Sequence, residues 1–127
     1  MTEVAATIAA SLIAVVALFQ LALVFGAPWG QAAWGGQNPG RLPARLRVAS
    51  LGSAVLLILM AWVILATAGI VEVPPVPTSW LRPLTWVITA YFSLGAVMNL
   101  ISRSRLERIW SPVSLVIAVC CALVAAS

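Results

Sequence analysis

VASLGSAVLLILMAWVILATAGIV, residues Val48–Val71, contains no charged side chain. A helix of about 20 apolar residues crosses the roughly 30 Å hydrocarbon layer of a bilayer, and this segment is long enough to do so. Residues Val4–Phe25 form a second uncharged run of similar length. Two such runs predict that the chain is an integral membrane protein.

The overall composition supports the same prediction and argues against a nucleic-acid partner. The chain of 127 residues is 63% hydrophobic and only 8% charged, whereas a soluble domain is about 25% charged. Its net charge of +4 comes from arginines, because the chain contains no lysine. These arginines lie at the ends of the apolar runs, without the interleaved aromatic residues of a nucleic-acid site. We therefore expect membrane lipids as partners and no nucleic acid.

We expect an all-α fold, a four-helix transmembrane bundle that forms one transmembrane domain over residues 1–127. The apolar runs predict helices at about 3–25, 48–71, 80–101 and 109–126. Pro112 falls in the first turn of the last helix, where its missing N–H costs little. A loop over residues 26–47 would join the first two helices.

The arginines predict how the bundle is oriented. All of them except Arg82 fall in the first or the third connector between the expected helices. Cytoplasmic connectors carry an excess of Lys and Arg, so both termini should lie on the non-cytoplasmic side. The same side chains could contact anionic lipid headgroups or simply anchor the topology. They are Arg41, Arg45, Arg47, Arg103, Arg105 and Arg108.

Small residues at helical spacing indicate which helix faces pack together, because helices in lipid associate through close packing. The first helix offers a stripe of alanines, and the fourth offers small residues at the same spacing. The expected stripes are Ala6, Ala10, Ala14 and Ala17 on the first helix, and Ser114, Ala118, Cys121 and Ala125 on the fourth.

Two amides should meet at the cytoplasmic end of the bundle. Gln20 lies on the alanine stripe, and Asn99 lies on a polar stripe of the third helix near the same end. An amide that faces lipid costs several kcal/mol, so these groups should converge with nearby serines. They form either hydrogen bonds between helices or a polar pocket for a lipid headgroup or small solute. The candidate polar site is Gln20, Ser50, Ser53, Asn99 and Ser114.

The first connector is dominated by the segment GAPWGQAAWGGQNPG, Gly26–Gly40. This connector has about 22 residues, whereas helices in a bundle are usually joined by ~2–8. Its glycines do not form a phosphate-binding loop, because the GxxxxGKS/T pattern and its lysine are missing. It is therefore either a plain connector or an interfacial or re-entrant flap over Gln20 and Asn99. The candidate lid residues are Trp29, Gln31, Trp34 and Asn38.

The chain offers few groups for catalysis. It has no histidine, aspartate or lysine, and its acids Glu3, Glu72 and Glu107 lie at the ends of the expected helices. General acid–base catalysis needs two titratable groups within reach of one substrate. We expect Glu107 to pair with Arg103 one turn earlier or with a neighbour of a lipid-facing arginine, and the two adjacent cysteines of the last helix to be buried and reduced. We therefore expect no catalytic residue, no metal, no cofactor and no enzymatic activity.

Three segments carry a resemblance to other proteins: GAPWGQAAWGG, the LPARLR that follows it, and NLISRSRLERIWSP. In this order they resemble a loose group of uncharacterised bacterial four-helix integral membrane proteins of the actinobacterial type. The resemblance implies four helices and location in the bacterial inner (plasma) membrane. It implies no activity.

Two functions remain open from the sequence. The leading hypothesis is a small non-enzymatic membrane protein, either an accessory subunit with a protein partner or homo-oligomer, or a lipid-contacting helical bundle. The alternative is a small oligomeric channel or transporter with a polar site at the cytoplasmic end. Proton-coupled transport normally relies on a carboxylate or histidine inside the membrane, and the sequence places none in the middle of a helix.

Overall fold

The computed structural model describes every residue from Met1 to Ser127 and contains four long helices and no strand. All four helices are long and apolar enough to cross a membrane. These findings confirm the all-α class and indicate a multi-pass membrane protein. The helices are α1 (Thr2–Val24), α2 (Ala44–Thr67), α3 (Leu81–Leu100) and α4 (Trp110–Ala126).

The second helix differs from its expected range, because it begins at Ala44 rather than at residue 48 and ends at Thr67 rather than at residue 71. Pro43 is the N-cap residue, with extended backbone, and its carbonyl accepts the first helical N–H groups, from Leu46 at 3.0 Å and Arg47 at 3.1 Å. Gly69 follows it with a φ of +79°, the left-handed conformation that ends many helices. Proline and glycine therefore set both boundaries, and Arg45 and Arg47 belong to the helix.

Short 3₁₀ turns adjoin the other elements. Thr78–Trp80 (η3) leads into α3, and Glu107–Ile109 (η4) leads into α4. The first connector contains two more, Gly30–Ala32 (η1) and Trp34–Gly36 (η2). This connector is therefore a folded segment.

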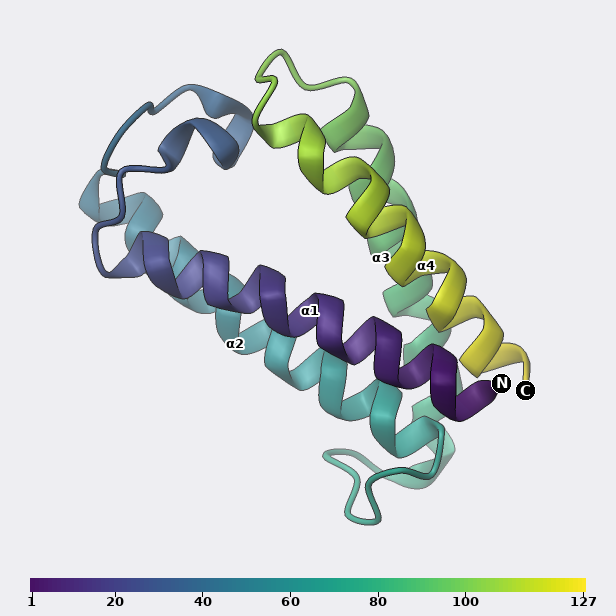
Figure 1. The fold of residues 1–127 in the computed structure, drawn as a ribbon. Helices are drawn as coiled ribbons and strands as arrows, with labels where there is room; N and C mark the ends of the chain where they lie inside the picture. Colours follow the sequence, from purple (N-terminus) through teal and green to yellow (C-terminus); the bar gives the residue numbers. More distant parts are fainter.

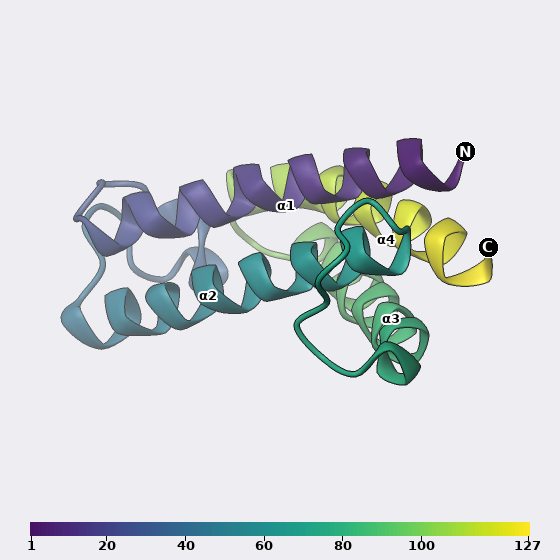
Figure 2. The same cartoon turned by 90° about the horizontal axis from the view of Figure 1, so that it is seen from below.

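The four helices form two hairpins arranged as a V. Helix α1 packs mainly along α2, and α3 packs mainly along α4. The hairpins meet near the two chain ends and separate toward the opposite end (Figures 1 and 2). Where they meet, the Thr67 and Thr85 hydroxyls are 2.9 Å apart and hydrogen-bonded. We call this the termini end, and we call the other, which carries residues 25–43 and 101–109, the loop end.

The main hydrophobic core fills the termini end and the middle of the bundle. Small side chains let the helices approach closely there, and both cysteines are buried among them. The pattern on α1 differs from the expected stripe, because Ala9 and Ile13 are buried while Ala14 is exposed. Ile13 points between the helices, so the packed face lies about one residue away from the stripe of alanines alone. The fully buried members of this core include Ala6, Ala9, Ile13, Ile64, Ile117, Cys121 and Val124.

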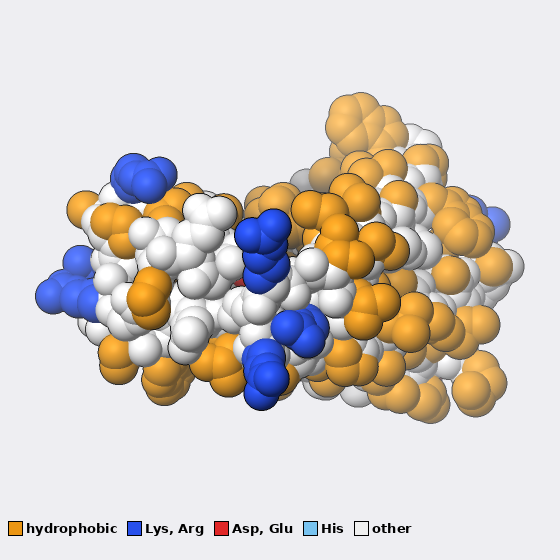
Figure 3. Space-filling model, turned by 90° about the horizontal axis from the view of Figure 1, so that it is seen from above, with side chains coloured by type: hydrophobic (Ala, Val, Ile, Leu, Met, Phe, Trp, Pro, Cys, Tyr) orange, Lys and Arg blue, Asp and Glu red, His pale blue; other side chains and the backbone are white.

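A second, smaller core lies at the loop end. Leu23 of α1 packs with Ala33 and Leu42 of the first connector. Arg47 of α2 holds the two ends of the connector together, because its Nε donates to the carbonyl of Val24 at the end of α1 (2.9 Å). Figure 3 shows arginine side chains gathered on the face formed by the two connectors, whereas hydrophobic side chains cover the helices.

Candidate functional site

A cavity of about 320 Å³ lies between the separated hairpins at the loop end. Residues from all four helices, the first connector and η4 line it. It is present because the hairpins diverge there while the first connector closes the space above them. Its polar lining residues are Gln20, Ser53, Asn99, Glu107 and Ser114.

Gln20 presents an unsatisfied amide to this cavity. It lies about one turn before the end of α1, and its Oε1 is buried with no hydrogen-bond partner in the chain. A buried acceptor left unpaired costs about 1–3 kcal/mol. An occupant that donates a hydrogen bond would offset that cost.

Asn99 supplies a second acceptor from α3. Its Nδ2 donates to the carbonyl of Gly95, one turn earlier, at 2.8 Å. That bond fixes the orientation of the amide and leaves Oδ1 available. Ser114 of α4 is buried and Ser53 of α2 is half-buried, so hydroxyls from both hairpins complete the polar lining.

Glu107 adds a negative charge to the lining. Its Oε2 accepts a hydrogen bond from the backbone N–H of Gly35 at 2.7 Å. The expected pairing with Arg103 is therefore wrong, because the 3₁₀ turn of η4 directs the carboxylate to the first connector. The nearby Arg108 donates instead to the carbonyls of Ser102 and Arg103, at 3.0 and 3.4 Å.

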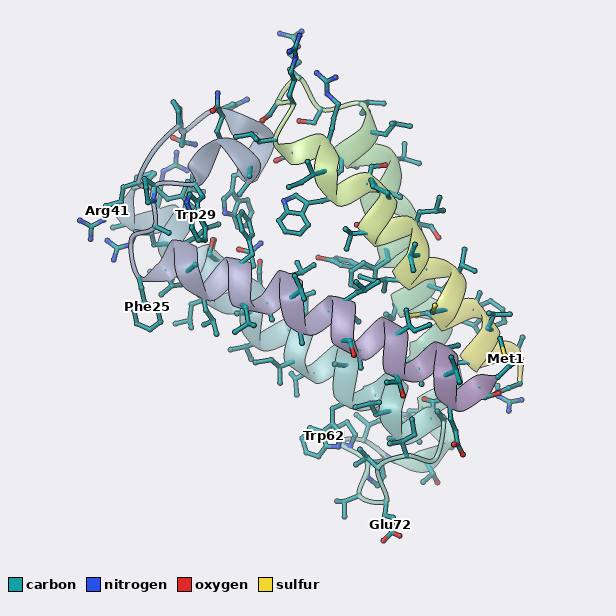
Figure 4. All side chains as sticks on the ribbon, viewed as in Figure 1. Met1, Phe25, Trp29, Arg41, Trp62 and Glu72 are labelled. Carbon is teal, nitrogen blue, oxygen red and sulfur yellow. The ribbon has the colours of Figure 1, made fainter.

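Aromatic side chains form much of the remaining wall, and they belong to α1, α3, α4 and the first connector. Phe19 of α1 and Trp110 of α4 meet across the gap with ring centroids 4.8 Å apart. This pair closes the side of the cavity between α1 and α4, and Figure 4 shows side chains from both hairpins extending into the space between them. The aromatic lining residues are Phe19, Trp34, Tyr91, Phe92 and Trp110.

The two indoles of the lining hold the first connector in place. Trp34 Nε1 donates to Ser50 Oγ, and Trp110 Nε1 donates to the carbonyl of Ala32, both at 3.0 Å. Ser50 is fully buried by this contact and does not line the cavity. Both indole N–H groups are thus occupied by protein acceptors.

Only one of the four candidate lid side chains reaches the cavity. Trp34 lines it together with Ala32 and Ala33, which form its roof. Trp29 lies parallel to Phe19 with centroids 6.3 Å apart, outside the lining. Gln31 accepts a hydrogen bond from Ser104 Oγ through its carbonyl, and Asn38 is also outside the lining.

The connector has to be compact to form this roof. A Cβ on Gly30 would collide with the carbonyl oxygen of Asn38. Glycine at position 30 therefore allows two segments of the connector to lie in contact. The N–H of Gly30 donates to the carbonyl of Gly40 at 2.9 Å.

The candidate lipid-contacting arginines remain outside the cavity lining. Arg103 borders a second, open hollow that shares only Met98 and Glu107 with the cavity. Of the six, Arg47 is half-buried against α1, and the other five are exposed: Arg41, Arg45, Arg103, Arg105 and Arg108.

The open side of the cavity lies between α2 and α3. The most exposed lining residues are Tyr91, Leu94 and Met98 of α3, at 47%, 63% and 57% exposure. Helices α2 and α3 have few contacts, and their side-chain hydrogen bonds, from Thr67 to Thr85 and to the carbonyl of Leu81, lie at the termini end. In a membrane this opening would face lipid.

Comparison with known protein families, curated proteins and solved structures finds no match for this chain. The chain also has no group of three or more His, Cys, Asp or Glu side chains that could hold a metal ion. The cavity and its lining are therefore the basis for a functional proposal.

Sequence reasoning missed Glu107 and every aromatic lining residue except Trp34. Glu107 and Trp110 lie in or next to η4, which turns them toward the first connector. A tryptophan directly before an apolar run, beside the chain's one acid at that end, was the available signal.

Proposed function

We propose that the protein is a non-enzymatic membrane protein that binds one amphipathic molecule in the loop-end cavity. The observation that carries this proposal is the buried, unpaired Oε1 of Gln20 in a cavity that opens between α2 and α3. A polar group in that position requires a polar partner. The side opening leads to lipid, so the partner also has to be partly apolar.

The dimensions of the cavity fit such a ligand. Its volume of about 320 Å³ is at the lower end of the ~300–1,000 Å³ typical of small-molecule sites. A polar head would fill it, and an apolar tail would leave between the helices. The exposed Leu94 and Met98 of α3 would then lie along the tail.

The proposal includes an orientation in the bacterial inner membrane. The arginine-rich loop end faces the cytoplasm, in accordance with the positive-inside tendency. The exposed arginines around it would contact anionic headgroups, each contributing about 1 kcal/mol. The ligand would then enter from the cytoplasmic leaflet.

The termini end supports binding over conduction through a single chain. Ile13, Ile64 and Ile117 have no exposed surface in the core below the cavity. A pathway across the membrane would have to pass through this packed region. A channel would therefore need several copies of the chain, whereas a binding site is complete in one copy.

Native mass spectrometry of the protein in mild detergent tests the proposal. We expect wild type to retain one amphipathic molecule per chain. Ser53→Phe fills the cavity from α2 and should lose it. Ser93→Phe makes the same change at an exposed position of α3 outside the lining and should keep it. Wild type without a bound molecule, or equal retention by both variants, would contradict the proposal.

A further inference from the structure

The charge of the cavity lining is opposite to that of the chain. The chain has a net charge of +4, but the one charged lining residue is Glu107. The six loop-end arginines all lie outside the lining. Glu107 thus borders both the cavity and the adjoining hollow, and Arg103 borders only the hollow.

The aromatic residues are concentrated at the same place. The chain has six tryptophans, three phenylalanines and one tyrosine, and half of these line the cavity. The N–H groups of Trp34 and Trp110 are bonded to Ser50 and Ala32, so neither indole has a free donor for an occupant, and what these side chains add to the lining is aromatic ring surface. Aromatic faces attract cations, and recognition of quaternary ammonium groups commonly uses several of them together.

The polar atoms left free by the fold point to the same kind of ligand. Gln20 Oε1 has no donor, and the amide of Asn99 uses its nitrogen for Gly95 and leaves its oxygen free. Both oxygens are acceptors. The hydroxyls of Ser53 and Ser114 in the lining can accept as well as donate. Free amide oxygens, one carboxylate and aromatic faces are together complementary to a positively charged hydrogen-bond donor.

We propose that the ligand is an amphiphile with an ammonium head, either a protonated amine or a quaternary ammonium. This inference rests on the proposed binding function. The head occupies the space among Glu107, Gln20 and the aromatic rings, and the tail leaves between α2 and α3. The source is either a lipid of the bilayer with an amine headgroup or a free cationic amphiphile.

An anionic head fits the same cavity poorly. It would face the carboxylate of Glu107 and the negative faces of the aromatic rings without an arginine in the lining. Arg103, which borders the adjoining hollow, is positioned for an anion outside the cavity. The lining therefore favours a cationic head in two ways: it attracts cations, and it repels anions.

Three probes with the same tail test the inference by tryptophan fluorescence, because Trp34 and Trp110 line the cavity. They are decyltrimethylammonium, its uncharged tert-butyl isostere and decyl phosphate, each titrated in dodecyl maltoside micelles. We expect saturable binding of the cation and at least about tenfold weaker binding of the other two. Equal binding of decyl phosphate would overturn the ammonium inference and leave amphiphile binding intact, whereas equal binding of the isostere, which has no polar head, would overturn both. Binding of none of the probes would overturn both.

Two pairs of variants assign the effect to residues. Glu107→Gln removes the charge but keeps an acceptor for Gly35 N–H, and we expect about tenfold weaker cation binding. Glu72→Gln makes the same change at the far end of the molecule (Figure 4) and should bind as wild type does. Tyr91→Leu should weaken binding about fivefold, whereas Tyr91→Phe, which keeps the ring face, should not.

The Tyr91 pair stands by itself if Glu107→Gln does not fold, because Tyr91 is exposed on α3. Unchanged cation affinity in a folded Glu107→Gln, or equal affinities of the Tyr91→Leu and Tyr91→Phe variants, would overturn the proposal.

Competition distinguishes the two sources of the ligand. Phosphatidylethanolamine or phosphatidylglycerol is added to the micelles before decyltrimethylammonium is titrated. Competition by phosphatidylethanolamine alone supports an amine-bearing lipid of the bilayer. Competition by neither supports a free cationic amphiphile. Equal competition by phosphatidylglycerol would show that the site does not distinguish ligands by the charge of the head, and it would overturn the inference.

Discussion

The two ends of the bundle are built from helices of similar composition but differ in the size of the side chains between the hairpins. At the termini end, Ala6 and Ala9 of α1 are fully buried, and the helices pack without a gap. At the loop end, the rings of Phe19 and Trp110 meet across the gap instead. Small residues permit close approach of helices in lipid, and bulky rings prevent it. The cavity therefore follows from where the small and the large residues lie.

The largest expected effect comes from enlarging a small residue at the termini end. Ala9 has no exposed surface, so Ala9→Leu should force the hairpins apart and lower the free energy of unfolding by about 2–3 kcal/mol. Ala14→Leu places the same side chain on the exposed face of α1 and should change the free energy of unfolding little. Denaturation of the detergent-solubilised protein measures both. Equal stabilities would mean that small residues do not set the separation of the hairpins.

A smaller effect is expected from removing one indole N–H at the loop end. Trp110→Phe keeps a ring against Phe19 but loses the hydrogen bond to the carbonyl of Ala32. We expect a loss of about 1 kcal/mol and faster amide hydrogen exchange in the roof, residues 30–36. Trp80→Phe makes the same change at an exposed site of the termini end and serves as the control. Unchanged exchange in the Trp110→Phe roof would show that this bond does not hold the connector.

The smallest expected effect is an increase in the stability of the ligand-free protein. Gln20→Leu removes the buried oxygen that has no partner, so the ligand-free protein should be stabilised by up to about 1 kcal/mol. The same variant should bind decyltrimethylammonium more weakly. Thermal unfolding with and without that compound measures both changes. Loss of stability without the compound would show that Gln20 has a structural role instead.

The helices were predictable because each contains a long apolar run with charged residues only near its ends, and the packing face of α4 followed from residue spacing. All four expected members of that face are buried, namely Ser114, Ala118, Cys121 and Ala125. The face of α1 was predicted less well, since Ala14 is exposed and the buried Ile13 is not a small residue. The spacing of small residues identifies the packed face of a helix only where that face consists of small residues alone.

The site was predictable in part. The structure places Gln20, Ser53, Asn99 and Ser114 around one cavity, and the topology of antiparallel helices brings them to the same end. The separation of the hairpins, and with it the size of the cavity, depends on contacts such as Phe19 with Trp110 that no local pattern encodes. The same holds for Glu107, whose partner Gly35 is 72 residues away.

The bonds that close the roof also imply an order of assembly. Gly35, Gln31 and Ala32 are bonded to Glu107, Ser104 and Trp110, at sequence separations of 72, 73 and 78 residues. During synthesis the first hairpin is complete long before these partners are made, and contacts of high sequence separation form late. Until these residues are synthesised, the first connector lacks the hydrogen bonds that it makes in the complete protein. The cavity is the last part of the protein to form, so a chain that stops before α4 would lack it.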